Sequence, residues 1–217
     1  MLRKIAFLGG TFNPVHHGHL RLALDLVNIV GFEQVRLVPC HLPTHRQQPS
    51  VSSDMRASMV GQAIAGCHVL ALDRRELERG TATYSVDTLL ELRRELGDDV
   101  SLSMIMGTDA YLGLPRWHRW RELLSLAHLV VVERPGYSLA SHGELAEYDR
   151  QNTAELDALD NAAYGSIVHL SVRLLDISAT QIRALIARGQ STQYLLPESV
   201  RHFISKHGLY SADAPTC

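Results

Sequence analysis

The sequence contains few cysteines, little net charge and no long apolar run. Its 217 residues include three scattered cysteines, Cys40, Cys67 and Cys217, and no Cys-x-x-Cys pair. An odd, scattered set argues against a disulfide framework and indicates a reducing compartment. The formal net charge is -2 at pH 7, so the chain lacks the overall basic field of a nucleic-acid-binding protein. We therefore expect no nucleic acid partner, and an anionic ligand has to be met by local groups.

Membrane segments and secretion signals are not expected either. The apolar stretch near the N-terminus ends at Leu8, where two glycines follow, and it is too short for a signal-peptide core or a membrane span. The length and the 46% hydrophobic content suit one α/β domain with a sizeable core. We expect a soluble, cytoplasmic protein with a single domain over residues 1–212, a short tail over 213–217 and no membrane partner. The sequence leaves the oligomeric state open.

A glycine-rich turn with two histidines follows the first apolar segment. Residues 9–20 read GGTFNPVHHGHL. Gly9 and Gly10 allow the backbone to approach a ligand that a side chain would push away. A helix that starts near Gly18 would direct its first N–H groups and its positive dipole end at the same ligand, with His16 and His19 beside them. The pattern fits a nucleotide phosphate site.

Two simpler explanations of the histidine pair are surface residues and half of a metal site. His16 and His19 are too close for the zinc pair of a helical metalloprotease, and no Glu follows the first histidine. The turn also lacks the second and third glycines of the dehydrogenase fingerprint. Phosphate handling remains the favoured interpretation.

Apolar strand-like segments alternate with helical patterns along most of the chain. We expect strands at 5–8, 34–38, 68–72, 100–106 and 128–132, with further order at 167–175. Helices are expected at 18–30, at 54–65 with Asp54 as its cap, at 85–96, at 178–187 and after Pro197. Alternating strands and helices predict an α/β fold with a doubly wound, Rossmann-like parallel sheet. Ligands of such sheets bind beyond the carboxyl ends of the strands, and the polar residues that follow strands there are His16, His45, Asp109, Arg134 and Ser178.

Two long segments between these elements differ in what they predict. Residues 39–53 form a long polar loop, which we expect to be functional. Residues 136–165 are rich in Ser, Ala, Asp, Glu and Asn with weak periodicity, which predicts a mobile surface insertion without readable chemistry.

A second candidate phosphate element begins at Ser178. Ser178 and Gln181 match a capping box and could simply stabilise a helix start. This leaves Thr180 and Arg183, a hydroxyl and a guanidinium on the first turn, where side chains and amides together can cradle an anion. Alone, Arg183 could equally be a solvated helix residue.

The two elements together resemble the nucleotidylyltransferase superfamily, with its (His/Thr)-x-Gly-His and Ile-Ser-x-Thr-x-x-Arg signatures. The intervening chain is similar to the bacterial nicotinate-nucleotide adenylyltransferases through residues 39–46, 82–89, 107–109, 115–117 and 196–197. The resemblance covers nearly the full length and implies the nucleotidylyltransferase fold with a small helical C-terminal part. It departs from the family pattern at Cys40, where relatives often have a small polar residue, and at Arg46, where lysine is commoner.

The resemblance implies transfer of AMP from ATP to nicotinate mononucleotide, which gives deamido-NAD and pyrophosphate. It implies Mg²⁺ as a cofactor that arrives with ATP and takes most of its ligands from phosphate and water, so we expect no metal ligands from protein side chains. The attacking phosphate is already ionised and needs no general base, so catalysis becomes positioning and charge stabilisation.

The site residues follow from the same resemblance. Three are implied to be catalytic: His16, His19 and Arg183. The implied ATP site also contains Gly9, Gly10, Thr11, Phe12, Gly107, Asp109, Arg134, Ser178 and Thr180. The implied mononucleotide site contains His45, Arg46, Tyr84, Ser85, Val86 and Trp117.

Each group of residues has an implied partner. His19 would stabilise charge at the α-phosphate, the Ser178 element would hold the β and γ phosphates, and Asp109 would hold the ribose near an adenine that Arg134 approaches. His45 and Arg46 would bind the mononucleotide phosphate. Trp117 would stack on the pyridine unless it packs in the core, and amides near Ser85 would receive the nicotinate carboxylate.

Other hypotheses belong to different classes. Within the superfamily, the chain could be a nicotinamide-mononucleotide or a pantetheine-phosphate adenylyltransferase. Outside it, the chain could be a non-catalytic nucleotide-binding module, or a metal-binding protein given its 12 histidines. No spacing of four ligands supports a structural metal.

Overall fold

A six-stranded sheet forms the centre of the computed structural model, which describes residues 2–43, 49–133 and 142–211. The strand order is β4-β2-β1-β6-β7-β8, and every pairing between neighbours is parallel. The strands are β1 (Arg3–Gly10), β2 (Gln34–Pro39), β4 (Leu70–Leu72), β6 (Val100–Gly107), β7 (His128–Val132) and β8 (Ile167–Leu170). A separate two-stranded sheet pairs β3 (Leu42–Pro43) with β5 (Ala82–Thr83). The predicted parallel α/β sheet is confirmed.

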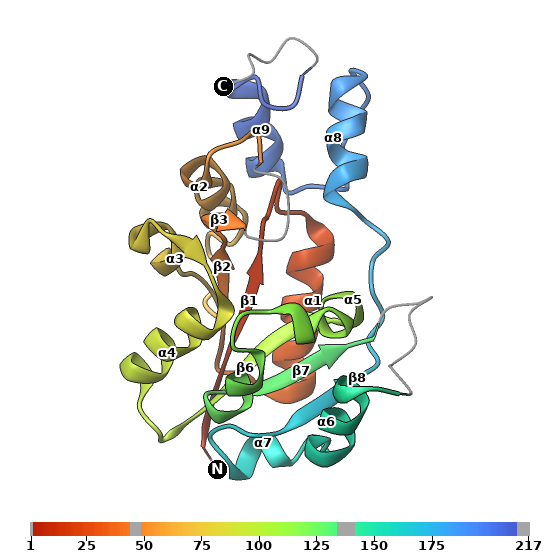
Figure 1. Ribbon diagram of the computed structural model, residues 1–217. Helices are drawn as coiled ribbons and strands as arrows, with labels where there is room; N and C mark the ends of the chain where they lie inside the picture. The colour runs from red at the N-terminus through yellow and green to blue at the C-terminus, as the bar shows by residue number, and fades with distance from the viewer. Residues whose placement is uncertain (1, 44–48, 134–141, 212–217) are drawn as a thin grey trace.

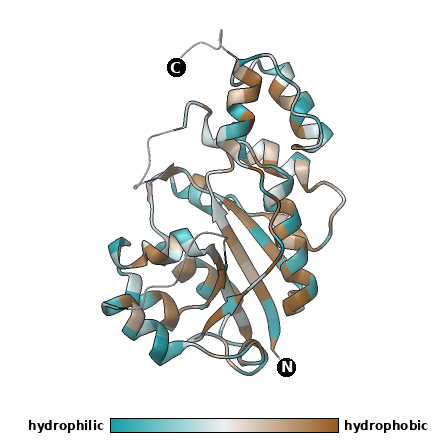
Figure 2. Ribbon diagram, turned by 90° about the vertical axis from the view of Figure 1, so that its right-hand side faces the viewer, coloured by the Kyte–Doolittle hydropathy of each residue, from teal (hydrophilic) through white to brown (hydrophobic). Residues whose placement is uncertain are grey.

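Helices connect the strands and cover both faces of the sheet (Figure 1). They are α1 (His17–Val30), α2 (Ser53–Ala63), α3 (Arg75–Arg79), α4 (Ser85–Leu96), α5 (Thr108–Leu112), α6 (Glu144–Asn152), α7 (Ala158–Asn161), α8 (Ala179–Ala187) and α9 (Glu198–Lys206), with short 3₁₀ turns at η1 (Leu114–Arg116) and η2 (Trp120–Ser125). Hydrophobic and hydrophilic stretches alternate along these helices (Figure 2), as expected for helices that cover a sheet with one face.

The strands are apolar because both of their faces are buried. In β7, Val130 and Val132 join a core cluster that also contains residues of α1, α2 and α9, whereas Leu129 and Val131 join a second cluster with residues of α4 and η2. Period-two alternation therefore divides one strand between two cores, as in a parallel sheet covered on both sides.

The helix ends agree with the sequence at some positions and differ at others. Gly31 ends α1 in the left-handed conformation with φ 74°, as predicted. The cap of α2 is Ser52, whose hydroxyl accepts from the amide of Met55, and Asp54 lies inside the first turn. The predicted Asp54 cap is therefore wrong. Ser52, two residues earlier, accepts from a first-turn amide of the helix, which is the role expected of Asp54.

The segment expected to be a mobile surface insertion contains packed structure where it is described, over residues 142–165. Leu145 in α6 and Leu159 in α7 are buried in the two core clusters. The amide of Ala154 donates to the carbonyl of Ile167 at 2.9 Å, which joins this segment to β8. The expectation of a surface insertion is therefore corrected for these residues, because helices of nine and four residues are too short to show a clear sequence period.

Two helices extend the molecule beyond the carboxyl end of β1. Figure 1 shows α8 and α9 above the tip of that strand, with the long chain from β8 leading up to α8. The described part of the chain contains no helix that is long and apolar enough to cross a membrane.

Candidate nucleotide site

The turn after β1 is shaped by close contacts at two glycines. A Cβ atom at Gly10 would lie 3.1 Å from the ring of Phe12, which is buried and has a φ of 46°. A Cβ atom at Gly18 would lie 3.0 Å from the ring of His16. Both distances are shorter than ordinary van der Waals contact, so a side chain at either position would push the ring of Phe12 or His16 aside by a few tenths of an ångström.

The two predicted histidines stack on each other at the start of α1. The ring centroids of His16 and His19 are 3.7 Å apart, and the edge of Phe12 contacts His19. Nδ1 of His19 accepts a hydrogen bond from the backbone amide of His16 at 3.3 Å. An accepting Nδ1 places the proton of a neutral imidazole on Nε2. His19 is therefore fixed as an Nε2–H donor by its own helix start.

One amide expected to face a ligand is used inside the protein. The backbone amide of His17 donates to the carbonyl of Leu195 at 3.1 Å. This bond attaches the chain before α9 to the start of α1, and it removes that amide from the anion-binding set. The positive end of the α1 dipole still points at the glycine turn.

The second phosphate element meets the first through Arg183. Its Nη1 donates to the carbonyl of Asn13 at 2.8 Å and its Nη2 to Oγ1 of Thr180 at 3.3 Å. The Ser178 hydroxyl caps α8 by accepting from the amide of Gln181. Arg183 is thus not a freely solvated helix residue, because it joins two segments that are 170 residues apart in the chain.

The predicted ribose-binding residues lie at the carboxyl end of β6, the strand next to β1. Gly107 ends that strand and Asp109 lies in the first turn of α5. The buried hydroxyl of Thr108 donates to the carbonyl of Val132 at 3.1 Å and fixes the start of α5 against the end of β7. Asp109 therefore lies at the same sheet edge as Gly9 and Gly10, as the sequence predicts.

The predicted pyridine-binding residues gather at the start of α4. Tyr84 precedes the helix and its ring contacts His118 at a centroid distance of 4.6 Å, while Ser85 is the first helical residue. The side chain of Val86 is fully buried, so only its backbone can meet a ligand. Trp117 is half-buried and packs against the second core cluster, so the structure leaves both stacking and core packing as roles for this ring.

Three of the predicted site residues, His45, Arg46 and Arg134, lie outside the described residues. The segment before His45 is attached to the pyridine end of the site, because β3 pairs with β5 directly before Tyr84. The amide of His41 also donates to Oγ1 of Thr83 at 3.3 Å.

Sequence reasoning missed Arg56 of α2, which is 1% exposed. Its guanidinium donates to the carbonyls of Thr11 at 2.6 Å and Cys40 at 2.7 Å. A signal was present, since Arg56 precedes the buried Met59 and Val60 by three and four residues and so shares their helix face.

Donors rather than metal ligands dominate the site. Within residues 2–43, 49–133 and 142–211, no three His, Cys, Asp or Glu side chains are grouped to hold a metal ion. Imidazole N–H, guanidinium and backbone amides bind anions, whereas a hard cation such as Mg²⁺ prefers oxygen ligands.

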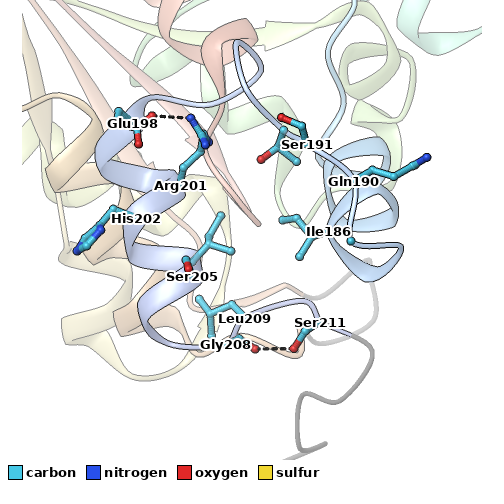
Figure 3. A pocket seen from close by; sticks show the side chains of 13 residues that line it. Ile186, Gln190, Ser191, Glu198, Arg201, His202, Ser205, Gly208, Leu209 and Ser211 are labelled. Atoms are coloured by element: carbon cyan, nitrogen blue, oxygen red, sulfur yellow. Dashed lines mark hydrogen bonds and ion pairs between the residues drawn. The ribbon is translucent and has the colours of Figure 1, made fainter.

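A separate pocket of about 570 Å³ lies between α8 and α9 (Figure 3). It is lined by Ile186 and Ser191 at the carboxyl end of α8 and by Arg201, Ser205 and Leu209. Ser178 and Thr180 lie at the other end of α8 and Arg183 lies in its middle, and none of the predicted site residues that the structure describes lines this pocket.

The sheet and the anion-binding groups at its carboxyl edge define a doubly wound α/β protein with a candidate nucleotide phosphate site. A family model described as cytidylyltransferase-like matches residues 7–185. The chain belongs to this cytidylyltransferase-like family.

The names of similar proteins are more specific than the description of the family model. A protein of Cellvibrio japonicus named "Probable nicotinate-nucleotide adenylyltransferase" is 52% identical over 210 residues, which is 97% of this chain and 100% of the relative. A protein of the same name from Marinobacter nauticus is 47% identical over 94% of this chain and 95% of the relative. A solved structure of Plasmodium falciparum nicotinic acid mononucleotide adenylyltransferase complexed with NaAD superposes with a TM-score of 0.71 at 15% identity, over 96% of this chain and 97% of that one. This last likeness establishes the shared fold.

Proposed function

We propose that the protein transfers AMP from ATP to nicotinate mononucleotide, forming deamido-NAD and pyrophosphate in NAD biosynthesis. The observation that carries the proposal is the meeting of two phosphate-binding elements, in which Arg183 of α8 bonds to Asn13 beside the stacked histidines of α1. The names of relatives that match over nearly the whole chain support the choice of substrates.

The reaction is an in-line displacement at the α-phosphorus of ATP. A phosphate oxygen of the mononucleotide forms the new P–O bond, and the bond between the α-phosphorus and the bridging oxygen breaks, so pyrophosphate leaves with the electron pair. The nucleophile is already an anion, so no base has to remove a proton. His19 donates from Nε2 to the α-phosphate oxygens, where negative charge has to be stabilised. Arg183, with the hydroxyls of Ser178 and Thr180, holds the departing β and γ phosphates.

The carboxyl end of β6 holds the ribose of ATP, and the start of α4 holds the pyridine of the mononucleotide. Asp109 accepts hydrogen bonds from the ribose hydroxyls of ATP, and Gly107 allows the sugar to approach the strand end. Amides at the start of α4 receive the nicotinate carboxylate, with Trp117 beside the pyridine ring. His45 and Arg46 bind the mononucleotide phosphate, and Arg134 lies near the adenine.

We propose Mg²⁺ as the cofactor that enters with ATP. It neutralises phosphate charge when bound, and the described residues supply the complementary N–H donors. The same proposal places the protein in the cytoplasm, where free thiols such as those of Cys40 and Cys67 persist.

The test is a set of separate incubations of the protein with Mg-ATP and nicotinate mononucleotide, nicotinamide mononucleotide or pantetheine phosphate, followed by chromatographic separation of the products. We expect deamido-NAD and an equal amount of pyrophosphate with nicotinate mononucleotide. Product from pantetheine phosphate alone would assign the chain to a different adenylyltransferase. Nucleotide binding without any product would indicate a non-catalytic module.

A further inference from the structure

Arg56 is the largest fully buried side chain in the described part of the chain. Its guanidinium donates to four carbonyls: Thr11 at 2.6 Å, Cys40 at 2.7 Å, and His41 and Val51 at 3.3 Å each. Within the described residues it forms no ion pair with a carboxylate. Buried charges are usually paired with an opposite charge, so this cation is held mainly by backbone dipoles, and burial lowers the pKa of the Arg56 guanidinium.

The four carbonyls belong to segments that serve different substrates. Thr11 lies in the turn after β1, which holds ATP in the proposed function. Cys40 and His41 follow β2 and lead into residues 44–48, whereas Val51 follows them before α2. One planar guanidinium therefore holds the ATP turn and the two segments on either side of residues 44–48, which we call the mononucleotide flanks, residues 40–43 and 49–51. The amide of Cys40 adds a second link, since it donates to the carbonyl of Gly10 at 2.9 Å.

We propose that Arg56 is a positioning residue that couples the ATP turn, residues 9–13, to the mononucleotide flanks, residues 40–43 and 49–51. The inference rests on the proposed function for the identity of the two substrates. Arg56 is too deeply buried to touch either one, so it acts through the backbones it holds. An in-line transfer needs the attacking and leaving groups aligned, and a misplacement of about 1 Å costs on the order of 10²-fold in rate. Through the same hydrogen bonds, binding of one substrate restricts the backbone of the segment that binds the other.

Arg93 provides a matched control. Its guanidinium also donates only to carbonyls among the described residues, namely those of Gly97, Val100, Leu126 and Ala163. Burial lowers the pKa of Arg93 as well. Its contacts lie at the opposite end of the sheet, where β6 begins at Val100. Arg93→Lys therefore tests the loss of a carbonyl-binding fork away from the substrates.

The experiment compares Arg56→Lys and Arg93→Lys in steady-state kinetics, with the melting temperature of each variant measured alongside. A lysine cannot span Thr11 and Cys40 in the plane of the fork. We expect Arg56→Lys to raise the KM of both substrates and to lower kcat, with a loss of about 10²-fold in kcat/KM, while Arg93→Lys stays within a few-fold of wild type. Near-normal kinetics for Arg56→Lys, a change in only one KM, or an equal kinetic loss in Arg93→Lys would each overturn the proposal.

Hydrogen exchange of the wild-type protein tests the coupling between the two segments even where Arg56→Lys does not fold. A non-hydrolysable ATP analogue alone is expected to slow exchange in residues 40–43 and 49–52, and nicotinate mononucleotide alone to slow it in residues 9–13. If each ligand left the exchange rate of the other segment unchanged, the coupling would be contradicted. Absence of deamido-NAD formation would refute the proposed function, whereas exchange with the ATP analogue alone would still test the coupling of the two segments.

Discussion

At the scale of the residue, His19 differs from its neighbour His17 in what fixes its ring. Nδ1 of His19 is held by the amide of His16, and its ring packs between His16 and Phe12. Such a ring loses little freedom when it donates from Nε2 to a transition state, so its contribution should fall on kcat. His17 is the first residue of the helix, and its backbone amide rather than its ring makes the described contact with Leu195.

We expect His19→Ala to lower kcat by about 10²-fold or more, with a modest change in the KM of ATP. His17→Ala is the control and should keep wild-type kinetics. Steady-state assays of both variants check this prediction. A His19→Ala enzyme with normal kcat, or one that loses only ATP affinity, would remove His19 from the chemical step.

At the scale of the element, a buried carboxyl joins α3 to α4. Glu76 is 4% exposed and its Oε1 accepts from the hydroxyl of Thr88 at 2.7 Å. Arg79 donates to the same hydroxyl at 3.2 Å and pairs with Glu91. Burial is the largest cause that raises the pKa of Glu76 to about 7 from an ordinary value of 4.5, while Thr88 and Arg79 lower it. The carboxyl is therefore neutral in the folded protein at pH values where it ionises in the unfolded chain.

The sign of the pH dependence follows from this difference. Between pH 4.5 and 7 the folded state binds more protons at Glu76 than the unfolded state does, so the free energy of unfolding falls as pH rises. The stabilisation is complete below 4.5 and is lost as pH rises through about 7. At about 1.4 kcal/mol per pKa unit, the full change is about 3 kcal/mol.

We expect Glu76→Gln to flatten the decrease in stability between pH 5 and 8, since an amide does not ionise. Glu78→Gln is the matched control, because Glu78 is exposed on the same short helix. Urea unfolding at several pH values measures the slope for each variant. An unchanged slope in Glu76→Gln would mean that the carboxyl is ionised in the folded protein.

At the scale of the whole molecule, the sequence predicts what depends on local pattern. Strand β7 and helix α4 have the predicted bounds because continuous apolar residues, a clear helical period and a terminal Gly97 mark them. The chain beyond β8 is less regular than expected, since β8 ends at Leu170 and the next residues to 178 form no strand. Short elements such as α3 and α7 escape detection because one helical turn contains too few residues to show a period.

The residues of the candidate site also divide into those that a local motif identifies and those that only the folded structure reveals. His16, His19 and Arg183 are identified by motifs, and the parallel topology brings them to one sheet edge. The place of Arg56 on the buried face of α2 can be read from the sequence, whereas its carbonyl partners have no signature there. That the amide of His17 is consumed by Leu195 is equally invisible, since the bond joins residues 178 positions apart and depends on how α9 docks.

In the proposed function, selectivity for the mononucleotide is also a property of the whole molecule, because the proposed pyridine subsite combines separate segments. The start of α4 supplies amides around Ser85, and Trp117 follows η1 about thirty residues later. The start of α4 and the segment of Trp117 meet where Tyr84 contacts His118. The hydrogen bond from the amide of His41 to Thr83 attaches residues 40–43 to the start of α4. Amide donors and a helix dipole favour a carboxylate, whereas a carboxamide presents its own NH₂ donor to them.

We therefore expect nicotinate mononucleotide to be preferred over the nicotinamide form. Each unpaired buried donor costs about 1–3 kcal/mol, so two of them give a ratio of kcat/KM on the order of 10² to 10⁴. Trp117→Ala should raise the KM of both mononucleotides and leave that of ATP near wild type, because stacking does not depend on the ring substituent. Kinetics with each mononucleotide measure both effects.

Trp120→Phe offers a control for the packing of this region, since Trp120 is buried and belongs to the core. Equal use of the two mononucleotides would overturn the carboxylate subsite while adenylyl transfer stands, and a Trp117→Ala enzyme that is merely less stable would assign that ring to the core.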